Sequence, residues 1–132
     1  MEKTIIILRS VSGAGKSSFA EFLKNLSMYG HFDTEICCAD DFFTDENGNY
    51  NFDATKLHLA HTECQEKFER AIALTNHDVR LVIVANTNTK EKDVNHYKKL
   101  VEEAKEHWSY QNKKPNVTYK VFVLTVENWH QG

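Results

Sequence analysis

The sequence has few of the features that mark membrane-spanning, linker-rich or repetitive proteins. Its longest uninterrupted apolar runs are residues 5–8 and 81–85, far short of the roughly 20 residues of a membrane-spanning helix. The chain holds one proline and five glycines, and it contains no linker, low-complexity segment or repeat. A strand-like run begins soon after Met1, so we expect no signal peptide. Because 41% of the residues are hydrophobic, we predict one domain over residues 1–132, with no membrane partner.

The sequence also lacks a surplus of basic residues and an even set of cysteines. Lys and Arg number 16 against 19 Asp and Glu, for a formal net charge of −3. Proteins that hold long nucleic acids usually carry a basic surplus, so this balance disfavours such binding but permits binding of one strand end. The cysteines are Cys37, Cys38 and Cys64. Their odd number and the adjacent pair favour reduced thiols over disulfides, and we expect a cytoplasmic protein.

Short apolar runs alternate with amphipathic stretches along the whole chain. Apolar residues recur at helical spacing after the first run and in two later stretches, which predicts helices over residues 19–26, 57–74 and 94–108. Asn47-Gly48 marks a loop or hairpin turn within residues 44–53. The apolar runs predict strands at residues 4–8, 35–39, 81–85 and 117–126. This alternation predicts an α/β fold, with a four-stranded, mainly parallel sheet and helices on both faces.

Polar clusters follow three of the predicted strands, at the edge where parallel sheets bind ligands. They are SVSGAGKSS, ADD and ANTN. The first, SVSGAGKSS at residues 10–18, lies between a buried strand and an amphipathic helix. Glycines let backbone N–H groups turn onto an anion, Lys16 can reach the β- and γ-phosphates, and the Ser17 hydroxyl can ligate Mg²⁺. The motif predicts a phosphate-binding loop for a nucleoside triphosphate, although Ser10 stands where such loops normally open with glycine. The predicted nucleotide-binding residues are Ser12, Gly13, Ala14, Gly15, Lys16, Ser17 and Ser18.

Asp40 and Asp41 follow the second predicted strand. A carboxylate there can take a proton from an attacking hydroxyl, hold Mg²⁺ through water, or cap a helix. Further on, His58, His61 and Cys64 resemble metal-ligand spacing, but Cys64 belongs to the apolar stripe of its predicted helix. Helix packing is the simpler interpretation, with His61 facing the cleft.

Several segments together resemble the polynucleotide 5′-hydroxyl kinase-like P-loop proteins, including small members labelled AAA-like ATPases. The resemblance covers residues 5–128, and it is carried by RSVSGAGKSS, CADDFFTDENGNYNF, AHTEC and ANTNTKEKD. It implies a P-loop NTPase fold of the kinase type and transfer of the γ-phosphate of ATP, with Mg²⁺, to a polynucleotide 5′-hydroxyl. Asp40 would be the general base, while Lys16 and Mg²⁺ on Ser17 would stabilise the developing charge. The residues facing the acceptor would include Asp41, Thr87 and Asn88.

The chain departs from that family at several positions. Ala85 and Asn86 stand where relatives keep a strand-end Asp, and Asn86 can bind a metal-bound water but adds no charge. Phe43 stands where polynucleotide kinases place an arginine for the acceptor phosphate. With Phe42 and Tyr50, it either faces the acceptor and stacks on a base or packs in the core.

The lid arginines of relatives are missing as well. The corresponding stretch, residues 126–132, offers Glu127, His130 and Gln131. The lysines after the third strand, from Lys90 to Lys105, are typical of a solvated helix face. These departures leave several alternatives open. The chain could be a slow kinase, or a kinase whose lid a partner protein completes, and a nucleoside or other small molecule could be the acceptor. It could also be a catalytically degraded nucleotide-binding module that acts as a regulator or interaction partner, or an ATPase that drives a partner.

Overall fold

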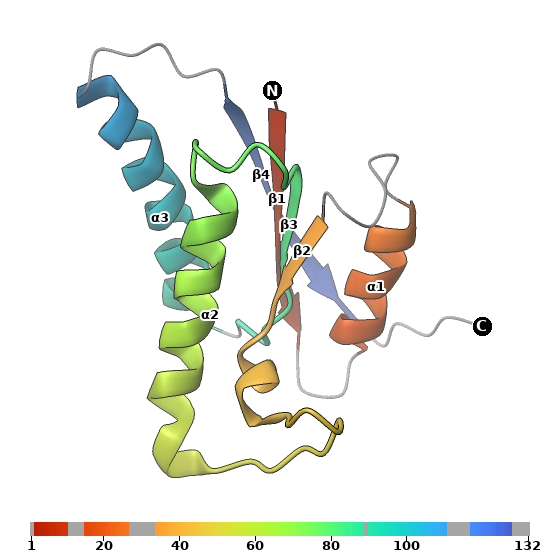
Figure 1. Ribbon diagram of the computed structural model, residues 1–132. Helices are drawn as coiled ribbons and strands as arrows, with labels where there is room; N and C mark the ends of the chain where they lie inside the picture. The colour runs from red at the N-terminus through yellow and green to blue at the C-terminus, as the bar shows by residue number, and fades with distance from the viewer. Residues whose placement is uncertain (1, 11–14, 27–33, 89, 111–116, 128–132) are drawn as a thin grey trace.

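The computed structural model describes residues 2–10, 15–26, 34–88, 90–110 and 117–127 (Figure 1). The predicted contacts of Ser12, Gly13 and Ala14 with a nucleotide therefore lie outside the described residues, as does the predicted lid segment from residue 128 onward. The strands are β1 (Glu2–Ser10), β2 (Thr34–Cys37), β3 (Leu81–Val84) and β4 (Thr118–Val126). The helices are α1 (Lys16–Leu26), α2 (Leu57–Ile72) and α3 (Glu91–Tyr110), with short 3-10 turns η2 (Ala39–Phe43) and η3 (Ala54–Lys56).

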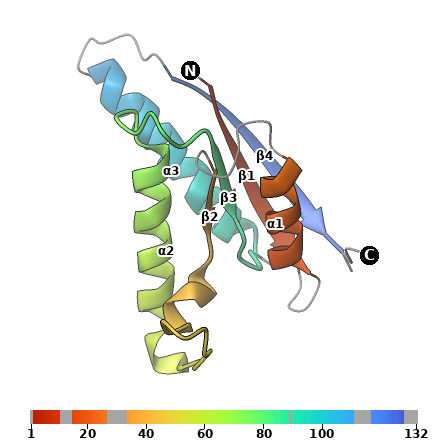
Figure 2. The ribbon, with the colours of Figure 1, turned by 45° about the vertical axis from the view of Figure 1, so that its right-hand side comes forward.

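The four strands form one parallel sheet in the order β2-β3-β1-β4. β1 lies inside the sheet and pairs with β4 over its full length, from Glu2 beside Thr118 to Ser10 beside Val126. It is therefore longer than the apolar run alone predicts. α1 covers one face of the sheet, and α2 and α3 cover the other (Figures 1 and 2). The predicted α/β architecture, with a four-stranded sheet and helices on both faces, is confirmed.

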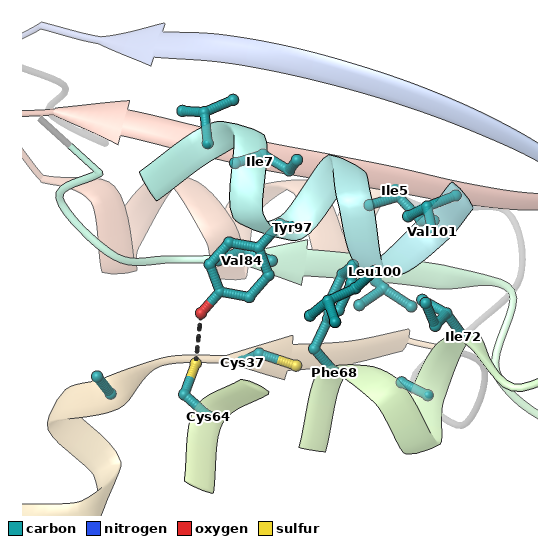
Figure 3. Close-up of a cluster of buried hydrophobic side chains, with 14 of the residues drawn as sticks. Ile5, Ile7, Cys37, Cys64, Phe68, Ile72, Val84, Tyr97, Leu100 and Val101 are labelled. Carbon is teal, nitrogen blue, oxygen red and sulfur yellow. Dashed lines mark hydrogen bonds between the residues drawn. The ribbon is translucent and has the colours of Figure 1, made fainter. Parts of the chain in front are cut away.

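The alternation of side chains along β1 explains why residues 5–8 are all apolar. Ile5 and Ile7 point to the core beneath α2 and α3, where Phe68 and Tyr97 meet edge to face with ring centroids 5.0 Å apart (Figure 3). Leu8 points to the opposite core beneath α1. Because both faces are covered, successive residues of this run are apolar although they point in opposite directions.

α2 ends at Ile72 and not at Leu74, since the next residue, Ala73, has an extended backbone. Leu74 is nevertheless buried, so its place in the apolar pattern reflects packing and not helix. Among the described residues, no helix is both long and apolar enough to cross a membrane.

The loop between β2 and α2 contains the predicted turn. Thr44 and Tyr50 form an isolated antiparallel bridge, and Gly48 has a φ of 82°, which favours glycine. The Asp45 carboxylate accepts the N–H groups of Asn47 and Asn49 at 2.9 Å each. The turn brings the aromatic residues of this loop back beside η2.

Candidate functional site

The carboxyl ends of β1 and β3 lie side by side, and the chain leaves them toward opposite faces of the sheet. β1 leads to α1 on one face, while β3 leads to α3 on the other. In open parallel sheets such a switch point is where ligands bind. The Ser10 N–H donates to the Thr87 carbonyl at 2.8 Å, so the start of the predicted phosphate loop is joined directly to the end of β3.

The end of the predicted phosphate loop has the geometry of a helix start. Gly15 has a φ of 88°, a conformation that disfavours any residue with a Cβ. Its carbonyl accepts the Phe19 N–H at 2.9 Å, and α1 begins with Lys16 directly after it. Ser17 and Ser18 are exposed in the first turn, which contains no acidic residue. The N-terminus of α1 is therefore open to an anion.

Ser10 is compatible with this arrangement but carries an unusual hydroxyl. The residue is 6% exposed, and within the described structure its Oγ has no hydrogen-bond partner. It lies beside Val126, which belongs to the core beneath α1. The place of the customary glycine thus accepts a side chain, at the expense of an unsatisfied buried hydroxyl, which typically destabilises a fold by about 1–3 kcal/mol.

Asp40 and Asp41 lie in the first turn of η2, immediately beyond β2. Their predicted role as a helix cap is wrong for this turn, because its N-cap is Cys38 and no side chain caps it. Asp40 is exposed, and its Oδ1 accepts a long hydrogen bond of 3.4 Å from the Tyr50 hydroxyl. Burial raises the pKa of Asp41, an effect that Lys67 opposes and the Asp40 charge reinforces.

The pKa of the Cys38 thiol depends on its burial and on the charged groups around it. Burial raises the pKa of Cys38, a backbone hydrogen bond to Asp40 lowers it, the Asp41 and Asp40 charges raise it and the Lys16 ammonium lowers it. Because β1 and β2 run parallel in one sheet, α1 with Lys16 and η2 with Asp40 both follow carboxyl ends at the same edge. The structure brings the predicted phosphate-binding lysine and the predicted base to the same edge of the sheet.

Asn86 belongs to a buried hydrogen-bond network that sequence reasoning missed. Its Oδ1 accepts the Ala39 N–H at 2.8 Å, and its Nδ2 donates to the Tyr97 hydroxyl at 3.2 Å. Nδ2 also lies 3.5 Å from Cys64 Sγ, which is 3.4 Å from the Tyr97 hydroxyl (Figure 3). Both ends of the amide are thus occupied by protein groups. Asn86 fixes the first residue of η2, which differs from the expected contact with a metal-bound water.

Asn88 joins the ends of β1 and β3. It has a φ of 46°, which asparagine tolerates better than most residues. Its Nδ2 donates to the Leu8 carbonyl at 2.8 Å, and its own carbonyl accepts from Arg9 Nε at 3.0 Å. With 6% exposure, Asn88 presents little surface to an acceptor, whereas Thr87 is partly exposed. Their contact with an acceptor stays a prediction.

The aromatic residues near Asp40 divide into buried and exposed ones. Phe43 is 6% exposed and belongs to the core, with its ring edge to face against Phe42 and Phe52 at 5.1 Å each. Of the two interpretations of Phe43, the structure favours packing over contact with the acceptor. Tyr50 and Phe52 are each 54% exposed. The sequence analysis overlooked Phe52 because it lies in a polar loop without periodicity.

Besides a small pocket of about 80 Å³ whose lining includes Cys38, Asp41 and Lys67, two larger pockets lie close to this edge of the sheet. The one we call the α2–α3 pocket has a volume of about 350 Å³, and its lining includes His61, Gln65, Thr87, Lys92, Asp93 and His96. The other, the loop pocket, has a volume of about 620 Å³, and its lining includes Phe42, Thr44, Asp45, Phe52, Asp53 and Lys56. Sequence reasoning assigned Lys92 to a solvated face and did not consider His96, because a helical position alone does not show what lies opposite.

The spacing of His58, His61 and Cys64 does not produce a metal site. Cys64 is buried beside Tyr97, while His58 and His61 are exposed. Over the described ranges, no group of three or more His, Cys, Asp or Glu side chains is arranged to hold a metal ion. All three cysteines are free thiols.

Comparison with known proteins supports the fold. No family model matches the chain, and no curated protein does. Among solved structures, a chain of the Pnkp1/Rnl/Hen1 complex matches with a TM-score of 0.54 and 19% sequence identity. The match covers 91% of this chain and 35% of that one, so this chain spans about a third of the length of its structural neighbour. The likeness shows a mixed α/β fold shared with a component of a multi-protein complex.

Proposed function

We propose that this chain is a phosphotransferase of the P-loop kinase type, which moves the γ-phosphate of ATP, with Mg²⁺, to a polynucleotide 5′-hydroxyl. The observation that carries the proposal is the placement of Lys16 at the start of α1 and of Asp40 and Asp41 in η2, because both segments follow carboxyl ends of parallel strands at the same edge of the sheet. A cation for phosphates and a carboxylate for a hydroxyl are what phosphoryl transfer needs in one place. The fold shared with a component of the Pnkp1/Rnl/Hen1 complex is compatible with nucleotide-related phosphotransfer, and the choice of a polynucleotide 5′-hydroxyl as acceptor rests on the sequence resemblance.

In this proposal each group has a defined part. The N-terminus of α1 and Lys16 bind the phosphates and stabilise charge on them. The exposed Asp40 carboxylate accepts the proton of the attacking hydroxyl, whose oxygen bonds to the γ-phosphorus while the bond to the β–γ bridging oxygen breaks. The Tyr50 hydroxyl helps to orient that carboxylate. Ser17 and Asp41 offer the oxygen ligands that Mg²⁺ prefers, and the ion would neutralise charge on the phosphates.

Label transfer tests the proposal directly. With γ-³²P-ATP, Mg²⁺ and a 5′-hydroxyl oligonucleotide, we expect labelled product from the wild type. Asp40→Asn should lower the rate of label transfer by about 10²–10⁴-fold while ATP binding is retained. Lys16→Ala should lower both the rate of label transfer and the affinity for ATP. Transfer that is unchanged in Asp40→Asn would remove Asp40 from the mechanism, and the absence of transfer from an ATP-binding wild type would contradict the proposal.

A second candidate is a nucleotide-binding module that regulates or recruits a partner. Asn86 favours it, because the end of β3 offers an amide already bonded to Ala39 and Tyr97 in place of an acid. The same assay separates the two functions. ATP binding that depends on Lys16, without transfer to any hydroxyl, would support the module.

A further inference from the structure

The two pockets near Asp40 differ in charge, and this difference selects a path for the acceptor. Asp40 follows β2 in η2, the loop pocket lies around the segment that continues from η2, and the α2–α3 pocket lies beyond β3. The small pocket beside Asp41 has a volume of only about 80 Å³, and its Lys67 is already paired with Glu35 at 3.0 Å. The two larger pockets are therefore the candidate paths for the next phosphates of a polynucleotide whose 5′ end lies at Asp40. A phosphodiester is an anion at every working pH, so local charge decides between the pockets.

The loop pocket is unsuited to a phosphate. Backbone hydrogen bonding from Asn49 lowers the pKa of Asp45, and hydrogen bonds from the Thr55 hydroxyl and N–H lower the pKa of Asp53. Both carboxylates therefore stay ionised at neutral pH. Against these two charges the lining offers one cation, Lys56. The exposed aromatic rings here adjoin a surface that repels the backbone of a nucleic acid.

The α2–α3 pocket has the opposite character. Lys92 and His96 reach it from the first turns of α3, and His61 reaches it from α2. All three side chains are exposed, so an ammonium and two imidazoles are accessible from solvent. Gln65 and Thr87 add neutral donors. Such a set suits a phosphate, which takes hydrogen bonds from several directions.

One acid also lines this pocket. Asp93 is partly buried, and its Oδ2 accepts the Lys90 N–H at 3.3 Å, which directs that oxygen toward the start of α3. Lys92 therefore balances the single carboxylate, and the imidazoles of His61 and His96 add hydrogen-bonding groups.

Two residues that line the α2–α3 pocket, Thr87 and Asn88, are joined to the end of β1. The Thr87 carbonyl accepts the Ser10 N–H, and the Asn88 side chain donates to the Leu8 carbonyl. Asn86, just before them, is bonded to Ala39 of η2, the neighbour of Asp40. The pocket is thus lined in part by residues that follow β3 at the edge of the sheet where α1 and η2 begin.

We infer that the acceptor strand passes from Asp40 into the α2–α3 pocket, where Lys92, His61 and His96 bind a backbone phosphate, and does not pass over the exposed aromatic loop. This inference rests on the proposed function and specifies its substrate: a single strand that carries at least one phosphate beyond its reacting end. It assigns to α2 and α3 the cationic contact that Phe43 cannot provide.

Binding of a 5′-hydroxyl single-stranded oligonucleotide, labelled with fluorescein at its 3′ end, tests this path by anisotropy without ATP. Lys92→Glu should weaken binding by about tenfold, since a charge-assisted contact is lost, and should lower the salt dependence by about one counterion. His61→Ala and His96→Ala should each weaken binding several-fold. Lys98→Glu is the matched control, because Lys98 is exposed on the same helix and does not line the pocket.

Lys56→Glu serves as the second control, in the loop pocket. Equal losses in Lys92→Glu and Lys98→Glu, or a larger loss in Lys56→Glu, would overturn the path. A wild type that binds no oligonucleotide would overturn it as well, while Lys16-dependent ATP binding and transfer to a phosphate-free hydroxyl would leave the phosphotransferase standing. Oligonucleotide binding that depends on Lys92, without label transfer, would support the path and contradict the phosphotransferase.

Discussion

At the scale of single residues, buried polar side chains decide how η2 is held in place. Asn86 is 5% exposed, and its amide joins β3, η2 and α3 through Ala39 and Tyr97. A buried amide whose groups are all hydrogen-bonded rigidifies its surroundings, whereas a buried amide that loses a hydrogen-bond partner destabilises the fold. The position of Asp40 therefore depends on a residue that need not touch the substrate.

Asn86 can be tested with two substitutions. Asn86→Ala leaves the Ala39 N–H without an acceptor and should lower the free energy of unfolding by about 1–3 kcal/mol, as measured by urea denaturation. It should also reduce kcat for label transfer with little change in the KM for ATP, because η2 and not the phosphate loop is disturbed. Tyr97→Phe, which keeps the ring in the core, should lower the free energy of unfolding and kcat by less than Asn86→Ala does. A decrease confined to stability, with kcat intact, would limit Asn86 to a structural role.

At the scale of elements, the amino-terminal end of β1 is joined to the end of α2 by one buried side chain. Lys3 is fully buried, and its Nζ donates to the carbonyls of Ala71, Asn76 and Val79 at 2.9, 2.7 and 2.6 Å. Each of the three N–H groups of the Lys3 ammonium thus has a carbonyl acceptor. Burial nevertheless lowers the pKa of Lys3 to about 8, and the Asp78 charge only partly offsets this.

Lys3 should make stability depend on alkaline pH. A lysine in the unfolded chain has a pKa of about 10.4. Between roughly pH 8 and 10 the unfolded chain therefore binds more protons than the folded protein, and the free energy of unfolding rises with pH. The unfavourable contribution is complete below pH 8 and is relieved by up to about 3 kcal/mol above it. Urea denaturation at several pH values should show this rise in the wild type but not in Lys3→Met. Cysteine and tyrosine titrations affect both proteins alike, so the difference between the two isolates Lys3. Parallel pH profiles would contradict the assignment.

At the scale of the whole molecule, the sheet protects its thiols unequally. Cys37 lies in β2 between the sheet and α2 (Figure 3), and burial raises its pKa to about 12. Cys64 is buried as well, whereas Cys38 is partly exposed with a raised pKa. Reactivity requires both access and the thiolate, and Cys37 lacks both until the fold opens.

Alkylation at pH 8, followed by mass spectrometry, should therefore modify Cys38 first and slowly. Cys37 should react only as fast as global unfolding allows, and all three thiols should react promptly in concentrated urea. Cys38→Ser should remove the early product. Early modification of Cys37 in the folded protein would show that β2 opens locally and independently of the rest of the sheet.

Local sequence patterns predicted most of the architecture. The apolar runs at β1 and β3 and the helical spacing around Phe68 and Val101 are consequences of burial on two faces and on one stripe, so they are readable without coordinates. Gly15 before Lys16 was likewise readable, because a strand-to-helix turn needs a left-handed residue there. The sequence by itself thus determined the α/β class, the parallel sheet and the presence of Lys16 and Asp40 at strand ends.

Only the tertiary structure decided which polar groups meet. Asn86 is joined to residues 11 and 47 positions away, and Lys92 shares a pocket with His61 from another helix. It also placed Phe43 in the core and left Phe52 exposed, although both are phenylalanines near the same turn. Periodicity reports the face of an element that is buried, but hydrogen bonds and pockets depend on distances between elements, which a local pattern does not contain.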